Sequence, residues 1–301
     1  MRRSIPTLLV GLAVLALSAA CGDDDTSAEG GAVTGRVAVV ATTTHLTDFV
    51  RIVGGNHVDV HGILPANVDP HDYEPSPADV ARLAAAKVIV KNGVGLEEWF
   101  DATIRNAEPQ ATIVDASTGV DLHRGDDPHI WLDPRNAKVM VRNITAALVA
   151  ADPERRGDYE ANEAAYVAEI DRLDGEIAAQ VAGLSNKKLV TNHDAFGYYV
   201  DRYGLEFVGS IIPSFDTSAE LSAADVSAIV SRIKQAGVKA VFSESSLPPK
   251  TAEAIGRDAG VAVVAGEDAL YLDSLGPPGS DADTYLKMLR HNTRVVVDHL
   301  R

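Results

Sequence analysis

The stretch PERRGDYEANEAAYVAEIDRLDGEIAAQV, residues 153–181, decides how the rest of the chain is organised. It has no proline after its first residue, and its apolar side chains recur every three or four residues, which places them on one face of a helix. They are Tyr166, Val167, Ile170, Leu173, Ile177 and Val181. One helix of about 29 residues measures about 43 Å and is long enough to connect two domains. Two shorter helices that break near Gly175 are the alternative.

On both sides of this segment, short β-branched runs alternate with stretches of helical periodicity. Strands are expected at 37–41, 58–63, 88–91, 112–115, 188–191, 206–211, 240–243 and 261–264. Helices are expected at 45–53, 76–85, 96–107, 223–236 and 249–259. Such alternation with apolar strands predicts parallel sheets covered by helices on both faces. We therefore predict an α/β fold with two lobes, residues 36–152 and 184–301. Each has a mostly parallel sheet flanked by helices, and one long rigid helix at 153–183 joins them.

Composition narrows the class of protein. The chain has 301 residues, of which 46% are hydrophobic and 23% are charged, and this balance is typical of a globular protein. Its net charge of −16 argues against nucleic acid or an anionic membrane surface as a partner of the folded part.

The first 20 residues have the pattern of a signal peptide. Arg2 and Arg3 precede an apolar run at 5–17, which is shorter than the roughly 20 residues of a spanning helix. Small residues then lead to Cys21, which resembles the lipid-acceptor cysteine of bacterial lipoproteins. We expect an extracytoplasmic protein anchored to the membrane only through lipidated Cys21, and periplasmic if an outer membrane is present. An ordinary secreted protein with an incidental cysteine is the alternative.

Residues 21–35 lack apolar periodicity and are expected to form a flexible tether between the anchor and the folded part. Cys21 is the single cysteine of the chain, so neither a disulfide framework nor a thiolate metal site is available. A transition-metal site in this protein must use nitrogen and oxygen ligands.

Three histidines lie in loop-like segments next to carboxylates: His71 in 69–75 (DPHDYEP), His129 in 127–134 (DPHIWLDP) and His193 in 191–197 (TNHDAFG). Prolines bracket the first two, and His193 follows a strand, at the end where open α/β sheets place their ligands. Neutral imidazole is the commonest protein ligand for zinc. Each histidine alone could be an ordinary hydrogen-bonded loop residue, but together they favour a metal site. His123, in a charged stretch near His129, is a weaker auxiliary candidate.

These three segments, in this order and separation, resemble the ligand motifs of the zinc/manganese solute-binding lipoproteins of ABC transporters, and the resemblance covers the whole mature chain. It implies a fourth, carboxylate ligand late in the second lobe, where Asp273 occupies the matching position and Glu267 and Asp268 lie close by. It also implies a binding protein rather than an enzyme, a membrane permease as partner and a monomer. Members that bind manganese or iron tend to carry Glu at the position of His193, so the resemblance implies one Zn²⁺ per chain, with Mn²⁺ as the alternative.

Four protein ligands would fill a tetrahedron and leave no position for an activated water. Nearby carboxylates could accept the second ring N–H of a ligand histidine; the candidates are Asp69, Glu74, Asp133 and Glu244. Since the histidines must be neutral to bind a metal ion, we expect the metal affinity to decrease as the pH drops below about 6.5.

Two other functions are consistent with the same residues. In a secreted zinc hydrolase, three histidines would hold the metal and Asp273 or Glu244 would act as the base. The sequence has neither a His-Glu-x-x-His helix nor a Gly-x-Ser-x-Gly turn, which argues against this class. A surface adhesin whose metal is structural is the second alternative.

Overall fold

The computed structural model describes residues 35–107 and 109–301 and contains two parallel four-stranded sheets. The first sheet has the order β2-β1-β3-β4, with β1 (Val37–Ala41), β2 (Val58–Gly62), β3 (Val88–Lys91) and β4 (Thr112–Asp115). The second has the order β6-β5-β7-β8, with β5 (Lys188–His193), β6 (Glu206–Ile212), β7 (Ala240–Phe242) and β8 (Ala262–Val264). The predicted signal peptide, Cys21 and nearly all of the tether lie outside the described residues.

Helices cover both faces of each sheet, as the apolar strands require. In the first lobe, α2 (Pro77–Ala85) and α3 (Glu98–Ala107) pack on one face, and α1 (Thr44–Gly54) and α4 (Pro134–Ala151) on the other. In the second lobe, α7 (Ala223–Ala236) and α8 (Lys250–Ala259) cover one face, and α6 (Gly197–Tyr203) and α9 (Tyr285–Leu300) the other. The side chains of adjacent strand residues point to opposite faces of the sheet: Val39 packs on the α1 side and Val40 on the α2 side.

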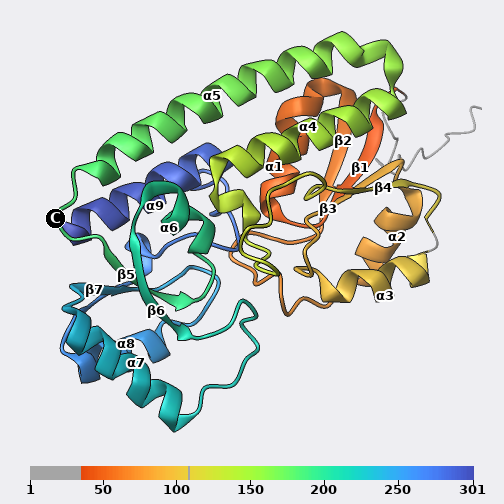
Figure 1. Cartoon of the computed structure of the whole chain (residues 1–301). Helices are drawn as coiled ribbons and strands as arrows, with labels where there is room; N and C mark the ends of the chain where they lie inside the picture. Colours follow the sequence, from red (N-terminus) through yellow and green to blue (C-terminus); the bar gives the residue numbers. More distant parts are fainter. Residues whose placement is uncertain (1–34, 108) are drawn as a thin grey trace, which may run out of the picture. The chain divides into compact units, whose positions relative to one another are not determined.

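Helix α5 (Arg156–Ala182) runs along both lobes without interruption (Figure 1). Its 27 residues correspond to a length of about 40 Å. The alternative of a break at Gly175 is wrong. A glycine costs a helix about 1 kcal/mol, and packing of the apolar face offsets this cost, because Tyr159, Ile170 and Ile177 are fully buried.

One apolar core is continuous from the first lobe to the second. It contains side chains from α1, α4, α5, α6 and α9, together with one face of each sheet. The two-lobed α/β fold joined by a long helix is therefore confirmed. No helix within the described ranges is both long and apolar enough to cross a membrane.

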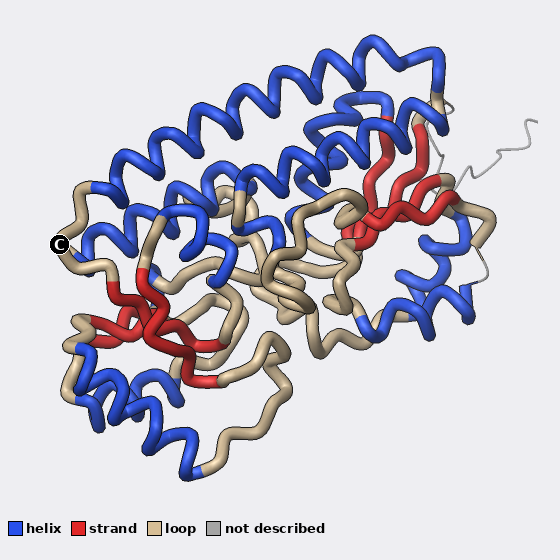
Figure 2. Tube along the Cα trace, in the orientation of Figure 1, coloured by secondary structure: helices blue, strands red, loops and turns tan. Residues whose placement is uncertain are grey.

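The carboxyl ends of β2, β4, β6 and β8 lead into long loops, and Figure 2 shows loops gathered between the two sheets. In both lobes the strands are parallel, so these ends lie at one edge of each sheet. Loop side chains from the two lobes can therefore meet there.

Candidate metal centre

Four side chains from both lobes converge between the sheets. His71 lies in the loop between β2 and α2, and His129 lies just before the 3-10 turn Ile130–Leu132. His193 is the last residue of β5, two residues beyond the predicted end of that strand. Asp273 lies in the segment between β8 and α9. One ligand atom of each residue lies within 4.8 Å of those of the other three.

The distances within this group fit one four-coordinate ion. Nε2 of His129 is 3.3 Å from Nε2 of His71 and 3.2 Å from Nε2 of His193. The carboxylate of Asp273 lies 3.2 Å from His129, 3.4 Å from His193 and 3.9 Å from His71. A tetrahedron with metal–ligand distances of about 2.0–2.1 Å has edges of about 3.3 Å.

Asp273 is the clearest sign that this group holds a cation. Its side chain is fully buried, and neither carboxylate oxygen has a hydrogen-bond partner among the described residues. A buried carboxylate without a hydrogen-bond partner is costly unless a positive charge compensates it. A divalent ion between Asp273 and the three imidazoles would supply that charge.

Two buried carboxylates orient the imidazoles. Nδ1 of His129 lies 2.8 Å from Oδ1 of Asp127, and Nδ1 of His193 lies 2.7 Å from Oε1 of Glu244. With the Nδ1–H of each ring donating a hydrogen bond to its carboxylate, Nε2 points at the centre of the group. Of the four carboxylates considered from the sequence, Glu244 is the one that contacts a ring nitrogen of this group.

The contact of Asp127 with His129 was not predicted from the sequence, although a repeated tripeptide indicated it. The tripeptide Asp-Pro-His occurs at 69–71 and again at 127–129. In both copies the aspartate accepts the backbone N–H of the histidine, at 2.9 Å for His71 and 3.1 Å for His129. Asp127 also reaches the ring, whereas Asp69 accepts a hydrogen bond at 2.5 Å from Thr217 of the other lobe.

The other sequence candidates lie elsewhere. Asp133 caps α4 by accepting the backbone N–H of Arg135 at 2.8 Å and pairs with the guanidinium of the same residue. Glu74 is exposed. His123 lies outside the group of four, with Nε2 3.4 Å from Asp201.

The surroundings give the three histidines different pKa values. Burial lowers the pKa of His71 to about 4. Burial acts in the same direction on His129, but Asp127 and Asp273 outweigh it and raise the pKa of His129 to about 10. Glu244 and Asp273 likewise raise the pKa of His193 against the effect of burial. The expected single midpoint near pH 6.5 assumed ordinary histidine pKa values, and these three depart from them in opposite directions.

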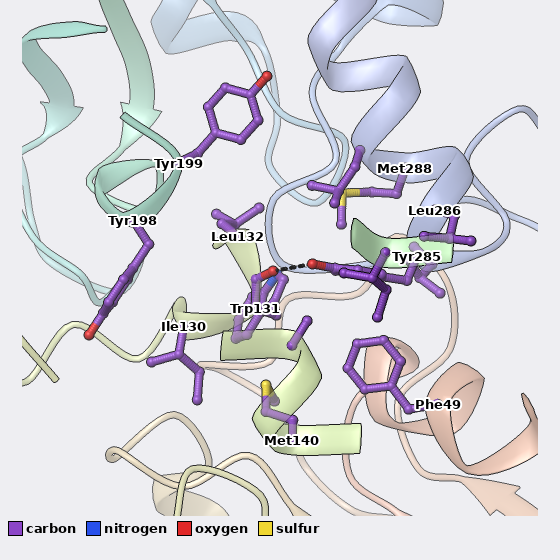
Figure 3. Close-up of a cluster of buried hydrophobic side chains, with 14 of the residues drawn as sticks. Phe49, Ile130, Trp131, Leu132, Met140, Tyr198, Tyr199, Tyr285, Leu286 and Met288 are labelled. Atoms are coloured by element: carbon purple, nitrogen blue, oxygen red, sulfur yellow. Dashed lines mark hydrogen bonds between the residues drawn. The ribbon is translucent and has the colours of Figure 1, made fainter. Parts of the chain in front are cut away.

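Trp131 connects the two lobes beside the group. Its indole N–H donates to the carbonyl of Leu272 at 2.9 Å, directly before Asp273. Its own carbonyl accepts the hydroxyl of Tyr285 at 2.7 Å, within the apolar cluster that also holds Phe49 (Figure 3). These contacts fix the backbone of Asp273 against the first lobe.

A cavity of about 360 Å³ adjoins His71, which is the least buried of the four residues. Glu98 and Asp126 of the first lobe and Asp216 of the second line it. Of the four residues, His71 alone lines this cavity.

Comparison with known proteins shows to which family the chain belongs. The sequence model of a family described as "Zinc-uptake complex component A periplasmic" matches residues 39–299. The chain belongs to this family. The iron ABC transporter substrate-binding lipoprotein MtsA of Streptococcus pyogenes serotype M1 is 32% identical over 273 residues, which cover 85% of this chain and 86% of the relative.

The matches to two further proteins span still larger shares of those proteins. The manganese ABC transporter substrate-binding lipoprotein PsaA of Streptococcus anginosus is 30% identical over 315 residues and covers 99% of both chains. The solved structure of the periplasmic zinc binding protein TroA from Treponema pallidum matches with a TM-score of 0.82 at 29% identity. That match covers 88% of this chain and 99% of that one.

Family membership confirms the resemblance seen in the three histidine motifs. The family consists of substrate-binding proteins of ABC transporters and not of enzymes, so the hydrolase alternative is excluded. The three proteins compared are named for iron, manganese and zinc, so membership alone does not select the metal. The choice of metal therefore depends on the donor atoms of this chain.

Proposed function

We propose that this protein binds one Zn²⁺ between its lobes through His71, His129, His193 and Asp273, and delivers it to the permease of an ABC importer. The observation that carries the proposal is the group of three imidazole nitrogens around one buried carboxylate that lacks a hydrogen-bond partner among the described residues. A donor set rich in imidazole suits zinc, whereas sites rich in oxygen suit manganese.

The arrangement suits a carrier. Four protein ligands enclose the ion and leave no open position for a reactive water, so the site would hold its cargo without chemistry. Two ligands belong to each lobe, so separation of the lobes would break the coordination sphere in half and release the ion. One chain supplies all four side chains, which supports a monomer.

Metal preference is tested by competition. We expect the purified protein to retain zinc, and zinc to displace manganese when the two are present at equal concentration. Mass spectrometry of the metal bound after dialysis against both ions gives the occupancy. Retention of manganese under these conditions would favour the alternative, a manganese carrier.

We also propose that the protein is held at the outer surface of the cell membrane through lipidated Cys21. The support is the sequence pattern before this residue and the relatives that are named lipoproteins. Replacement of Cys21 by serine is expected to move the protein from the membrane fraction to the soluble extracytoplasmic fraction. Membrane retention of this variant would contradict the anchor.

A further inference from the structure

The segment at residues 92–99 contacts both histidine loops of the first lobe. The side-chain amide of Asn92 donates to the carbonyl of Pro128 at 3.0 Å. The indole N–H of Trp99, in the first turn of α3, donates to the carbonyl of Pro70 at 3.0 Å. These two prolines are the central residues of the two Asp-Pro-His tripeptides, so each accepting carbonyl directly precedes a candidate ligand.

The sheet order explains how one segment reaches both loops. In the order β2-β1-β3-β4, the segment begins at the carboxyl end of the inner strand β3. The loop with His71 follows β2, on one side of β3, and the segment with His129 follows β4, on the other side. Residues 92–99 therefore begin between the two loops that carry the histidines.

The start of the segment is itself held in place by Glu97. The carboxylate of Glu97 accepts the backbone N–H groups of Asn92 at 2.6 Å and Gly93 at 3.2 Å, and the hydroxyl of Thr42 at 2.6 Å. Glu97 is buried, and burial raises its pKa. These three hydrogen bonds fix the turn from which the side chain of Asn92 extends.

The backbone of this turn is unusual. Gly93, Val94 and Gly95 have φ values of 84°, 54° and 75°. A β-branched residue with positive φ is an outlier and persists only where the surroundings determine the conformation. A Cβ atom at Gly93 would lie 2.3 Å from Oδ1 of Asp115, so a larger residue would combine an unfavourable φ with displacement of that carboxylate.

We propose that residues 92–99 form a brace that holds His71 and His129 as one preformed half of the metal site, with Asn92 and Trp99 as positioning residues. The inference rests on the proposed function. Neither residue supplies a donor atom to the ion. Each fixes the backbone next to a ligand, so that the imidazoles need not be ordered when the ion binds, and this preorganisation tightens binding.

Two variants remove the hydrogen bonds of the brace. Trp99→Phe keeps an aromatic ring against Tyr73 but lacks the indole N–H, and Trp99 is partly exposed, so this variant is expected to fold normally. Asn92→Ala removes the bond to the second loop. Each is expected to weaken zinc binding about threefold to tenfold, the range for loss of one hydrogen bond, as measured by competition with a chelator.

Asn143→Ala is the matched control. Asn143 also donates to two backbone carbonyls, those of Ala116 and Thr118, both at 2.9 Å, but neither adjoins a histidine of the site. This variant is expected to lower the melting temperature without changing zinc affinity. The visible spectrum of the Co²⁺-loaded protein should change in the Trp99 and Asn92 variants and not in the control, because it reports the geometry of the ligands.

Double variants decide whether Trp99 acts through its own histidine. In a His71→Ala background, Trp99→Phe should cause no further loss of zinc affinity, because the ligand that it positions is absent. In a His193→Ala background, the full threefold to tenfold loss should remain. Equal losses in both backgrounds, or wild-type affinity and Co²⁺ spectra in the Asn92 and Trp99 single variants, would overturn the brace. Unchanged zinc affinity in His71→Ala alone would overturn the proposed site itself and the brace with it.

Discussion

Replacement of His193 by alanine is expected to weaken zinc binding by about a hundredfold to a thousandfold. Zinc binding to a four-ligand protein site provides about 10–16 kcal/mol, or about 2.5–4 kcal/mol for each ligand, which corresponds approximately to this range. His193 is fully buried and lies 3.2 Å from His129 and 3.4 Å from Asp273. Among the described residues, no histidine besides His71, His129 and His193 belongs to the group.

The metal-free variant should keep its secondary structure. His193 is the last residue of β5, and strands pair through backbone hydrogen bonds. Its imidazole contacts Glu244 instead, so the sheet does not depend on the ring. The variant does leave Glu244 buried without its partner. Loss of one such hydrogen bond costs about 1–3 kcal/mol, and protonation of Glu244, whose pKa burial already raises, limits the cost. Circular dichroism and thermal unfolding of the metal-free protein measure both effects.

His291→Ala provides the control for this experiment. His291 is also buried and also pairs with a carboxylate, since its Nδ1 lies 3.1 Å from Asp281, but it lies outside the group of four. We expect His291→Ala to reduce stability and leave zinc affinity unchanged. If His193→Ala behaved like His291→Ala, His193 would not be a ligand.

Asp273→Asn is expected to weaken zinc binding by at least a hundredfold, because it removes the single anionic donor of the group and keeps the size of the side chain. The amide supplies one weak oxygen donor and an NH₂ group that cannot bind a metal. The exchange should barely alter the fold, since no hydrogen bond of the described residues depends on the carboxylate oxygens. Isothermal titration against a zinc chelator gives the affinity.

The same variant should change the pH dependence of binding. Burial lowers the pKa of His129, but Asp127 and Asp273 raise it to about 10, so in the metal-free protein this ring is protonated at neutral pH. Zinc must displace that proton, so apparent affinity rises with pH up to about pH 10 and falls as the solution becomes more acidic. Without Asp273 the pKa of His129 drops, although Asp127 still raises it, so the apparent affinity is expected to stop rising at a lower pH. Zinc affinity measured across the neutral and alkaline range locates this limit, and equal limits in both proteins would contradict this account.

The local elements of the fold could be predicted closely from the chain. The bounds of β1, β3, β4 and α7 agree with the prediction at both ends, because each is an apolar or amphipathic run with clear limits. Ser222, for example, caps α7 and forms a capping box with Asp225. The end of β5 was placed two residues early, because Asn192 and His193 are polar and interrupt the apolar pattern although both are buried.

The carboxylates around the histidines show where sequence reasoning stops. Asp133 and Asp127 lie in the same loop, four and two residues from His129. Asp133 precedes a proline that begins α4, and its oxygens bind the first turn of that helix and Arg135. This pairing of a capping residue with a first-turn proline is visible in the sequence and could have removed Asp133 from the candidates.

The chain alone determined the kind of chemistry. With Cys21 as its single thiol, and with His71, His129 and His193 in constrained loops, only a site of nitrogen and oxygen donors could form, and the spacing of apolar residues required two covered parallel sheets. The tertiary structure decided which atoms meet. The contacts of Asn92 with Pro128 and of Trp131 with Leu272 join residues 36 and 141 positions apart. No local pattern encodes such contacts, because they arise only when the packing of strands and helices brings distant loops to one place.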